Sequence, residues 1–512
     1  MNPIERLKAE KNGLDILEEI DELAAQHGGW ETLEPNDRER LKWIGTFFRK
    51  PTPGRFMMRV RITNGQLDSR QLSTLASLAQ RLGNGVIDIT TRQQLELRAV
   101  EIRDVPDILE ALRGVDLSSL QTGMDNIRGV NTCSLSGLTP YELFDAAPIG
   151  EQFTQTFLGN RDYTNLPRKL NVTITGCLEN CTHSETQDIA LTPATGPKAA
   201  HGFNVAVGGK MGSGGMTVAQ PLDVFIAPDE AASLAAAITL LFRDEGAREQ
   251  RTKARLAFLV QEWGPELFRQ RLEERWGAPL LPSGRDVRLQ RTTDHLGVTE
   301  QRQAGLYSVG LCVPTGRTQA GDMMELARIA EVYGAGAIRL TTGQNAIIVG
   351  VPEAKVQPLL DEPLLTRFSP SPHPFTRGLV SCTGKDYCNL ALIETKALGK
   401  ELADSLAARF PDAAPLTMNW SGCPAGCGNH HAADIGFQGA KARVDGEVVD
   451  AVSIFVGGRT GTDPRPGEKI MDLVPVSMLD ELLPVVIDNL TTLKKIRREQ
   501  PAEDRVLMVP VS

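Results

Sequence analysis

Four of the eight cysteines in this 512-residue chain lie between residues 382 and 427. Five residues separate Cys382 from Cys388, and three separate Cys423 from Cys427. Two close pairs of thiolates are typical of a metal site, and four sulfurs suit either a tetrahedral zinc ion or an iron–sulfur cluster. Structural zinc sites more often use shorter spacings, so the gap of five residues favours an iron–sulfur cluster. The alternative is four cysteines that act only as small packing residues.

The chain contains an internal duplication. Similar motifs recur in the same order at a separation of about 250 residues. The matched positions are Arg92 and Gly343 in Thr-Thr-x-Gln, Cys133 and Cys382, Cys177 and Cys423, and Gly208 and Gly457 in Val-Gly-Gly. Chance matches would not keep one order and nearly one separation. For Cys177 and Cys181, we favour packing relics over a function.

The two copies differ where chemistry is expected. The first copy has Thr139 where Cys388 would be matched, so it cannot bind the same cluster. It carries the cations instead: Arg92, Arg128 and Lys169. One copy can therefore supply electrons and the other positive charge, which predicts that an anion is reduced between them.

Hydrophobic periodicity predicts the elements that position these residues. Residues 56–62 alternate as a strand, 69–82 have the spacing of an amphipathic helix, and 86–98 predict a strand, a turn and a strand. This unit is half of a ferredoxin-like fold, and a helix over 320–333 repeats it in the second copy. Arg59 and Arg61 share one face of the first strand, either as a solvated face or as a binding surface for a polyanion.

The fold class follows as α+β, with three domains related by a pseudo-two-fold axis. Two ferredoxin-like halves complete one domain, and each copy adds a larger α/β domain. Before them, residues 1–45 predict helices, one beginning at Asn36 as N-cap. The expected boundaries are 1–45 for the helical extension, 46–115 and 291–365 for the halves, and 116–290 and 366–512 for the larger domains.

Charge, hydropathy and cysteine content argue against a nucleic-acid-binding, secreted or membrane protein. The net charge of −9 argues against nucleic acid as the main partner. The N-terminus has no signal-peptide core, and no apolar run reaches membrane length. Eight cysteines in so long a chain do not form a disulfide scaffold, so we expect a cytoplasmic protein whose thiolates remain available for metal. We also expect a monomer.

At this point the motifs resemble a known family, the siroheme and iron–sulfur nitrite/sulfite reductases, of the ferredoxin-dependent assimilatory nitrite-reducing type. The resemblance runs from about residue 41 to about residue 493. It depends on Lys42-Trp43-Ile44-Gly45, Gly54-Arg55-Phe56, Thr90-Thr91-Arg92-Gln93, Gly123 to Arg128, Asn165 to Lys169, Cys382-Thr383-Gly384 and Ser421-Gly422-Cys423-Pro424.

The resemblance implies a specific site. Cys382, Cys388, Cys423 and Cys427 match the ligands of a [4Fe–4S] cluster, and Cys427 matches the ligand shared with siroheme iron. Arg92, Arg128 and Lys169 match cations that hold the anion. The remaining implied siroheme contacts are Arg59, Arg61, Gly208, Gly209, Gly457 and Gly458.

Two substrates fit this scaffold, nitrite and sulfite. Sulfite reductases typically carry a second lysine where this chain has Asn171, so the resemblance favours six-electron reduction of nitrite to ammonium. No dinucleotide-binding motif occurs, which implies a separate electron donor. The resemblance implies that this donor is reduced ferredoxin. A siroheme-free iron–sulfur carrier or sensor is a weaker alternative, because a carrier needs no anion site, and a zinc-stapled binding protein is weaker still.

Overall fold

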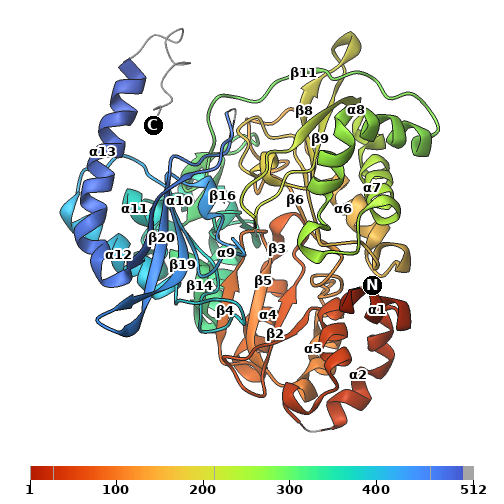
Figure 1. Cartoon of the computed structure of the whole chain (residues 1–512). Coiled ribbons are helices and arrows are strands. Elements are labelled where there is room, and N and C mark those ends of the chain that lie inside the picture. The colour runs from red at the N-terminus through yellow and green to blue at the C-terminus, as the bar shows by residue number, and fades with distance from the viewer. Residues whose placement is uncertain (1, 27, 213, 462, 500–512) are drawn as a thin grey trace.

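The computed structural model describes residues 2–26, 28–212, 214–461 and 463–499. Figure 1 shows two larger sheet domains on opposite sides of the molecule, with the strands of the ferredoxin-like halves between and below them. Three large hydrophobic cores correspond to this arrangement, and the first contains buried residues from both halves. Among the described residues, no helix is long and apolar enough to cross a membrane.

The two ferredoxin-like halves exchange strands. One sheet has the order β1-β2-β5-β4-β14 and the other β12-β13-β16-β15-β3, so each contains one strand from the opposite copy. The strands are β1(Thr46–Phe48), β2(Phe56–Val60), β3(Gln66–Asp68), β4(Val86–Ile89), β5(Leu95–Val100), β12(Gly297–Glu300), β13(Leu306–Leu311), β14(Arg317–Gln319), β15(Ala337–Leu340) and β16(Ala346–Pro352). The exchange confirms that the halves complete one domain.

Helices of the two halves also pack against each other. The helices here are α4(Ser69–Leu82), α5(Val105–Arg113), α9(Ala320–Tyr333) and α10(Glu353–Leu360). Helices α4 and α9 form the main contact between helices of the two copies. Helix α4 begins where the sequence predicts, because Asp68 and Gln71 form a capping box at its first turn.

The two larger domains have the same topology. Their sheet orders are β10-β9-β8-β7-β6 and β17-β18-β19-β20-β21; in each, three strands are parallel and the rest antiparallel. The strands are β6(Ile127–Asn131), β7(Leu170–Ile174), β8(Ile189–Thr195), β9(His201–Val207), β10(Gln220–Ile226), β11(Arg285–Asp286, paired with β8), β17(Leu379–Ser381), β18(Met418–Ser421), β19(Ile435–Val444), β20(Glu447–Val456) and β21(Glu468–Pro475). This repeated topology agrees with the predicted duplication.

Helices cover these sheets and form the N-terminal extension. They are α1(Pro3–Glu10), α2(Ile16–Ala25), α3(Pro35–Arg40), α6(Ala147–Phe157), α7(Pro228–Glu245), α8(Leu256–Trp276), α11(Pro374–Arg377), α12(Lys396–Arg409) and α13(Leu479–Glu499). The predicted N-cap at Asn36 is wrong: α3 is capped at Glu34, because Pro35 fits the first helical position. The predicted α+β fold class is confirmed.

Candidate active site

Parallel pairing brings the four predicted cluster cysteines to one edge of a sheet. Cys382 follows β17 directly, and Cys423 follows β18 after Gly422. Strands β17 and β18 are parallel neighbours, so their carboxyl ends lie side by side. Cys388 and Cys427 lie in the loops that continue from these ends, which explains why two distant sequence pairs form one group.

The cysteine sulfurs have the environment of cluster ligands. All four are free thiols, and backbone amides of Gly422 and Leu390 donate to the sulfurs of Cys382 and Cys388 at 3.1 and 3.4 Å. Hydrogen bonds of this kind tune iron–sulfur clusters. Among the described residues, no three of these four sulfurs lie within 4.8 Å of one another.

The three predicted anion-binding cations come from separate elements of the first copy. Arg92 lies in the turn between β4 and β5, Arg128 in β6, and Lys169 just before β7. The three cations repel one another electrostatically, and Cys427 attracts both Arg92 and Lys169. None of the three forms an ion pair with a carboxylate among the residues described in the structure. By contrast, Arg168 is paired with Asp125 at 3.6 Å.

Burial and mutual repulsion perturb these cations. Burial, with Arg92 and Arg255 nearby, holds the pKa of Lys169 well below its ordinary value. Burial lowers the pKa of Arg128 well below its ordinary value too, and Arg59 adds to the effect. The three cations are half-buried and repel one another, so an anion that enters would relieve the repulsion. The arrangement can therefore bind an anion beside Cys427.

A buried ion pair behind these cations was not predicted. Arg255 and Asp188 form a bidentate pair, with contacts of 2.8 and 3.0 Å. The Asp188 carboxylate also accepts from the backbone amide of Asn171 at 2.8 Å. It thereby fixes the start of β7, where the Asn171 side-chain oxygen is buried without a hydrogen-bond partner. Arg255 precedes a helix that carries no chemical motif, so the sequence offers no sign of this role.

Arg59 and Arg61 have different surroundings. Arg59 forms an ion pair with Glu96 at 2.6 Å and donates to the carbonyl of Thr122. Arg61 is 4% exposed and donates to the carbonyls of Leu120 and Ile127. Its Nε and Nη1 atoms have no partner. The predicted siroheme contacts of both arginines remain predictions.

The predicted glycine contacts lie in tightly packed turns. A Cβ atom on Gly209 would lie 2.2 Å from the carbonyl oxygen of Gln187, and one on Gly458 would lie 2.2 Å from that of His431. Gly208 and Gly457 both have positive φ, which favours glycine, and a Cβ on Gly457 would meet open space. Backbone packing alone therefore explains Gly209 and Gly458, and contact with a cofactor remains a prediction for all four.

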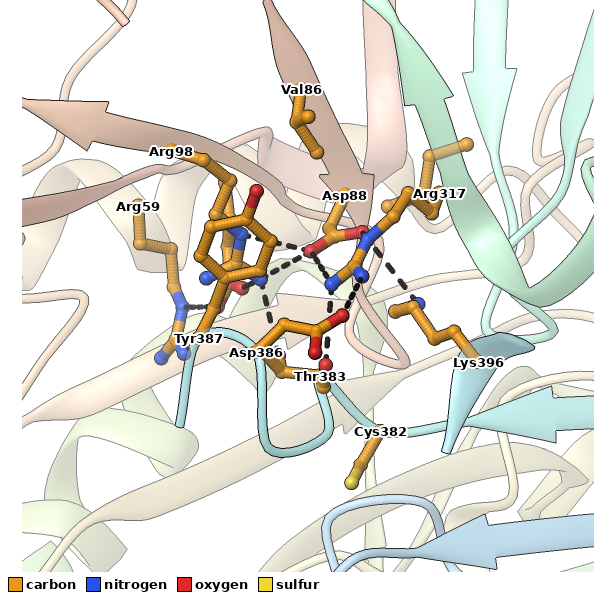
Figure 2. Close-up of polar contacts among 12 residues, drawn as sticks. Arg59, Val86, Asp88, Arg98, Arg317, Cys382, Thr383, Asp386, Tyr387 and Lys396 are labelled. Atoms are coloured by element: carbon orange, nitrogen blue, oxygen red, sulfur yellow. Dashed lines mark hydrogen bonds and ion pairs between the residues drawn. The ribbon is translucent and has the colours of Figure 1, made fainter. Parts of the chain in front are cut away.

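A buried ion-pair network lies behind the loop that carries Cys382. We call it the Asp88 network: Asp88, Glu96, Arg98, Arg317 and Lys396. Asp88 accepts from Arg98 and from Arg317, the latter at 2.9 Å, and lies 3.7 Å from the Lys396 ammonium (Figure 2). Arg98 also contacts Glu96 and donates to the Thr383 hydroxyl at 3.1 Å. The network therefore holds the cysteine loop against strands of both halves.

Two histidines follow Cys427. His430 is fully buried, and its ring centroid lies 4.1 Å from that of His431. Burial, with the neighbouring His431, lowers the pKa of His430 to about 3. His430 is therefore neutral near pH 7 and carries no imidazolium proton to donate.

Comparison with known proteins decides the family. Residues 123–280 and 373–505 match the nitrite and sulphite reductase 4Fe-4S domain, and residues 48–115 and 299–365 match the nitrite/sulfite reductase ferredoxin-like half domain. The chain belongs to the nitrite and sulphite reductase family. Both matched domains occur twice in this family member, in agreement with the duplication seen in its sheets.

Individual relatives of this family member match over most of their length. It is 46% identical to the ferredoxin–nitrite reductase of Synechococcus elongatus, over 94% of this chain and 95% of that protein. It is 39% identical to the chloroplastic ferredoxin–nitrite reductase of Spinacia oleracea, over 96% and 86%. The solved structure of Mycobacterium tuberculosis NirA superposes with a TM-score of 0.90 at 29% identity, over 95% and 93%.

Proposed function

We propose that this protein reduces nitrite to ammonium with electrons from reduced ferredoxin. The relatives from Synechococcus elongatus and Spinacia oleracea are named ferredoxin–nitrite reductases. The observation that carries the proposal is a group of cations that have no carboxylate partner among the described residues: Cys427 attracts Arg92 and Lys169, and Arg128 interacts electrostatically with both. An electron carrier would not need three half-buried, mutually repelling cations at its metal site.

Two cofactors fit the residues present. Cys382, Cys388, Cys423 and Cys427 would hold a [4Fe–4S] cluster, and their free thiols and the backbone N–H···S bonds to Cys382 and Cys388 support this assignment. A siroheme beside Cys427 would present its carboxylates to a region rich in unpaired guanidinium and ammonium groups. When bound, the two groups would relay the six electrons from the donor and provide the ligand site for nitrogen.

The cations of the chain bind nitrite, stabilise the developing charge and donate protons. Nitrite takes six electrons and eight protons to give ammonium and two waters. Arg92 and Arg128 donate N–H bonds to the nitrite oxygens and stabilise charge that develops there. Lys169 is a better proton donor than an ordinary lysine, because burial and Arg92 lower the pKa of its ammonium group. Each departing oxygen can therefore leave as water.

Asn171 supports nitrite over sulfite. It lies opposite Gly129 in the β6–β7 pairing, near Lys169, and contributes a neutral amide. Sulfite is partly dianionic near neutral pH and would gain from a further cation, whereas nitrite carries one charge. The spare Asn171 oxygen cannot compensate a second charge.

The partner and setting are part of the proposal. The donor is reduced ferredoxin, as the names of the relatives imply, and the protein works as a monomer in the cytoplasm. Size-exclusion chromatography with light scattering tests the monomer, because a particle of twice the chain mass would contradict it.

The experiment that tests the function targets the cations. We expect Arg92→Gln and Lys169→Gln each to lower kcat/KM for nitrite by roughly 10²-fold, as removal of a preorganised donor does. Both variants should keep the iron content and visible absorption of the parent. Arg81→Gln, which changes an exposed helix residue, is the matched control. Unchanged kcat/KM in both site variants would refute the assignment of the anion site.

A further inference from the structure

A second group of sulfur and nitrogen ligands lies in the first copy. The ligand atoms of Cys133, Cys181 and His295 all lie within 4.8 Å of one another, and Cys133 Sγ is 3.4 Å from His295 Nε2. The Cys177 sulfur interacts with the sulfurs of both Cys133 and Cys181. All four residues are buried. We call them the Cys133 group.

The spacing of Cys133, Cys181 and His295 suits a single ion. With bonds of 2.0 Å to nitrogen and 2.3 Å to sulfur, tetrahedral zinc would separate nitrogen from sulfur by about 3.5 Å and two sulfurs by about 3.8 Å. The observed 3.4 Å and the 4.8 Å limit agree with these values. The second copy differs, because its four cysteines do not meet that limit among the described residues.

The backbone around the Cys133 group already resembles that of a ligand site. Cys133 follows β6, and Cys177 and Cys181 follow β7, in the same topological positions as the cluster cysteines of the second copy. The amide of Glu179 donates to Cys177 Sγ at 3.4 Å, and that of Ser134 to Cys181. These bonds parallel those that Gly422 and Leu390 make in the second copy.

His295 distinguishes this group from simple packing. It belongs to the connection between β11 and β12, which leads from the first copy into the second, and it has the left-handed φ of 58°. Its side chain is 5% exposed and reaches the cysteines of another segment. An apolar core gains nothing from a buried imidazole, whose desolvation costs free energy unless a partner compensates it.

We propose that Cys133, Cys177, Cys181 and His295 bind a structural zinc ion that fastens the connection between the two copies to the first large domain. Three cysteines and one histidine form a common structural zinc set, and complete burial leaves no open position for a substrate. Cys177 does not belong to the set of ligand atoms within 4.8 Å of one another, so its sulfur would turn toward the other three to complete the tetrahedron. This inference does not depend on the proposed nitrite reduction.

Metal analysis of the purified full-length protein tests the inference directly. After expression in zinc-supplemented medium, we expect about one zinc per chain in addition to iron. Zinc-edge X-ray absorption should show three sulfurs and one nitrogen. Zinc below about a tenth of an ion per chain would overturn the proposal, as would a shell dominated by oxygen. A shell with only two sulfurs would remove Cys177 from the ligand set.

Variants separate this site from the iron–sulfur site. His295→Ala and Cys177→Ser should lose zinc and keep iron, whereas Cys382→Ser should lose iron and keep zinc. Cys312→Ser is the matched control, because Cys312 is buried outside both groups. Zinc retained in His295→Ala, or lost from Cys312→Ser, would contradict the assignment. If His295→Ala does not fold, the metal analysis of the unaltered protein still decides the question.

Discussion

The cations near the cysteines differ in whether a carboxylate pairs with them. Arg168 has Asp125 as a partner, whereas the adjacent Lys169 has no carboxylate among the described residues. Arg255 is neutralised by Asp188, whereas Arg92 faces Cys427 instead. The cations paired with a carboxylate are therefore structural. The cations that interact with Cys427 and have no such pair in the described part of the chain are available to bind an anion.

Substrate preference is predicted at the scale of one residue. Asn171→Lys should raise kcat/KM for sulfite relative to nitrite by roughly tenfold, because about 1.4 kcal/mol of transition-state stabilisation from a second ammonium corresponds to that factor. Steady-state assays with both anions on one preparation measure the ratio. Asn160→Lys, at an exposed helix-cap position, controls for added charge. An unchanged ratio would show that Asn171 does not set specificity.

The candidate site could be predicted where residues form local motifs. The four cysteines, Arg92 and Lys169 lie in short recognisable stretches, and the structure brings the cations close to Cys427. The Arg255–Asp188 pair and the position of His295 could not be predicted. Their partners are distant in sequence, and only the folded chain places them together.

At the scale of elements, the Asp88 network joins β4, β5, β14 and α12 behind the cysteine loop. Burial would raise the pKa of Glu96, but Arg98 and Arg59 dominate and hold it at about 2. The folded-state pKa is thus below the unfolded value, so Glu96 stabilises the fold above about pH 4.3. That contribution is lost as the pH falls from there toward 2.

Glu96→Gln tests this linkage. At pH 7 the change should destabilise the protein by about 3 kcal/mol, because it removes the carboxylate that Arg98 and Arg59 share and leaves buried Arg98 with Asp88 as its one carboxylate partner among the described residues. The difference in thermal midpoint from the parent should shrink as the pH is lowered below 4. Asp386→Asn alters the exposed carboxylate that also pairs with Arg317, and should cost less than about 1 kcal/mol. A Glu96→Gln deficit that is constant with pH would contradict the linkage.

Element prediction succeeds where local chemistry is strong. Helices over 69–82 and 320–333 are found with the predicted bounds, because periodicity defines them and, at Asp68, a capping box begins one. The exchanged strands β3 and β14 are three residues each and have no periodicity to detect. Their pairing depends on the other copy, so the sequence of one half cannot reveal it.

At the scale of the whole molecule, the duplication produces one interdependent unit. The first core contains residues of both halves, and each half lacks one strand of its own sheet. Neither copy can bury its apolar surface alone. The anion site likewise needs cations from one copy and Cys427 from the other.

Separation of the copies tests this interdependence. Fragments 1–290 and 291–512, expressed singly, should aggregate or remain largely unfolded, since each would expose part of the shared core. Coexpressed, they should associate, and size-exclusion chromatography with circular dichroism would detect the complex. A folded, monomeric 291–512 fragment would contradict the account and favour independent domains.

The most direct test of the central claim is a product measurement with isotope-labelled nitrite and reduced ferredoxin. The account predicts one labelled ammonium per nitrite consumed, six electrons donated by reduced ferredoxin for each, and slower formation of sulfide when sulfite replaces nitrite. Faster sulfide formation would show that the protein is a sulfite-reducing member of its family. Electron uptake without ammonium or sulfide would show that the unpaired cations beside Cys427 serve another anion.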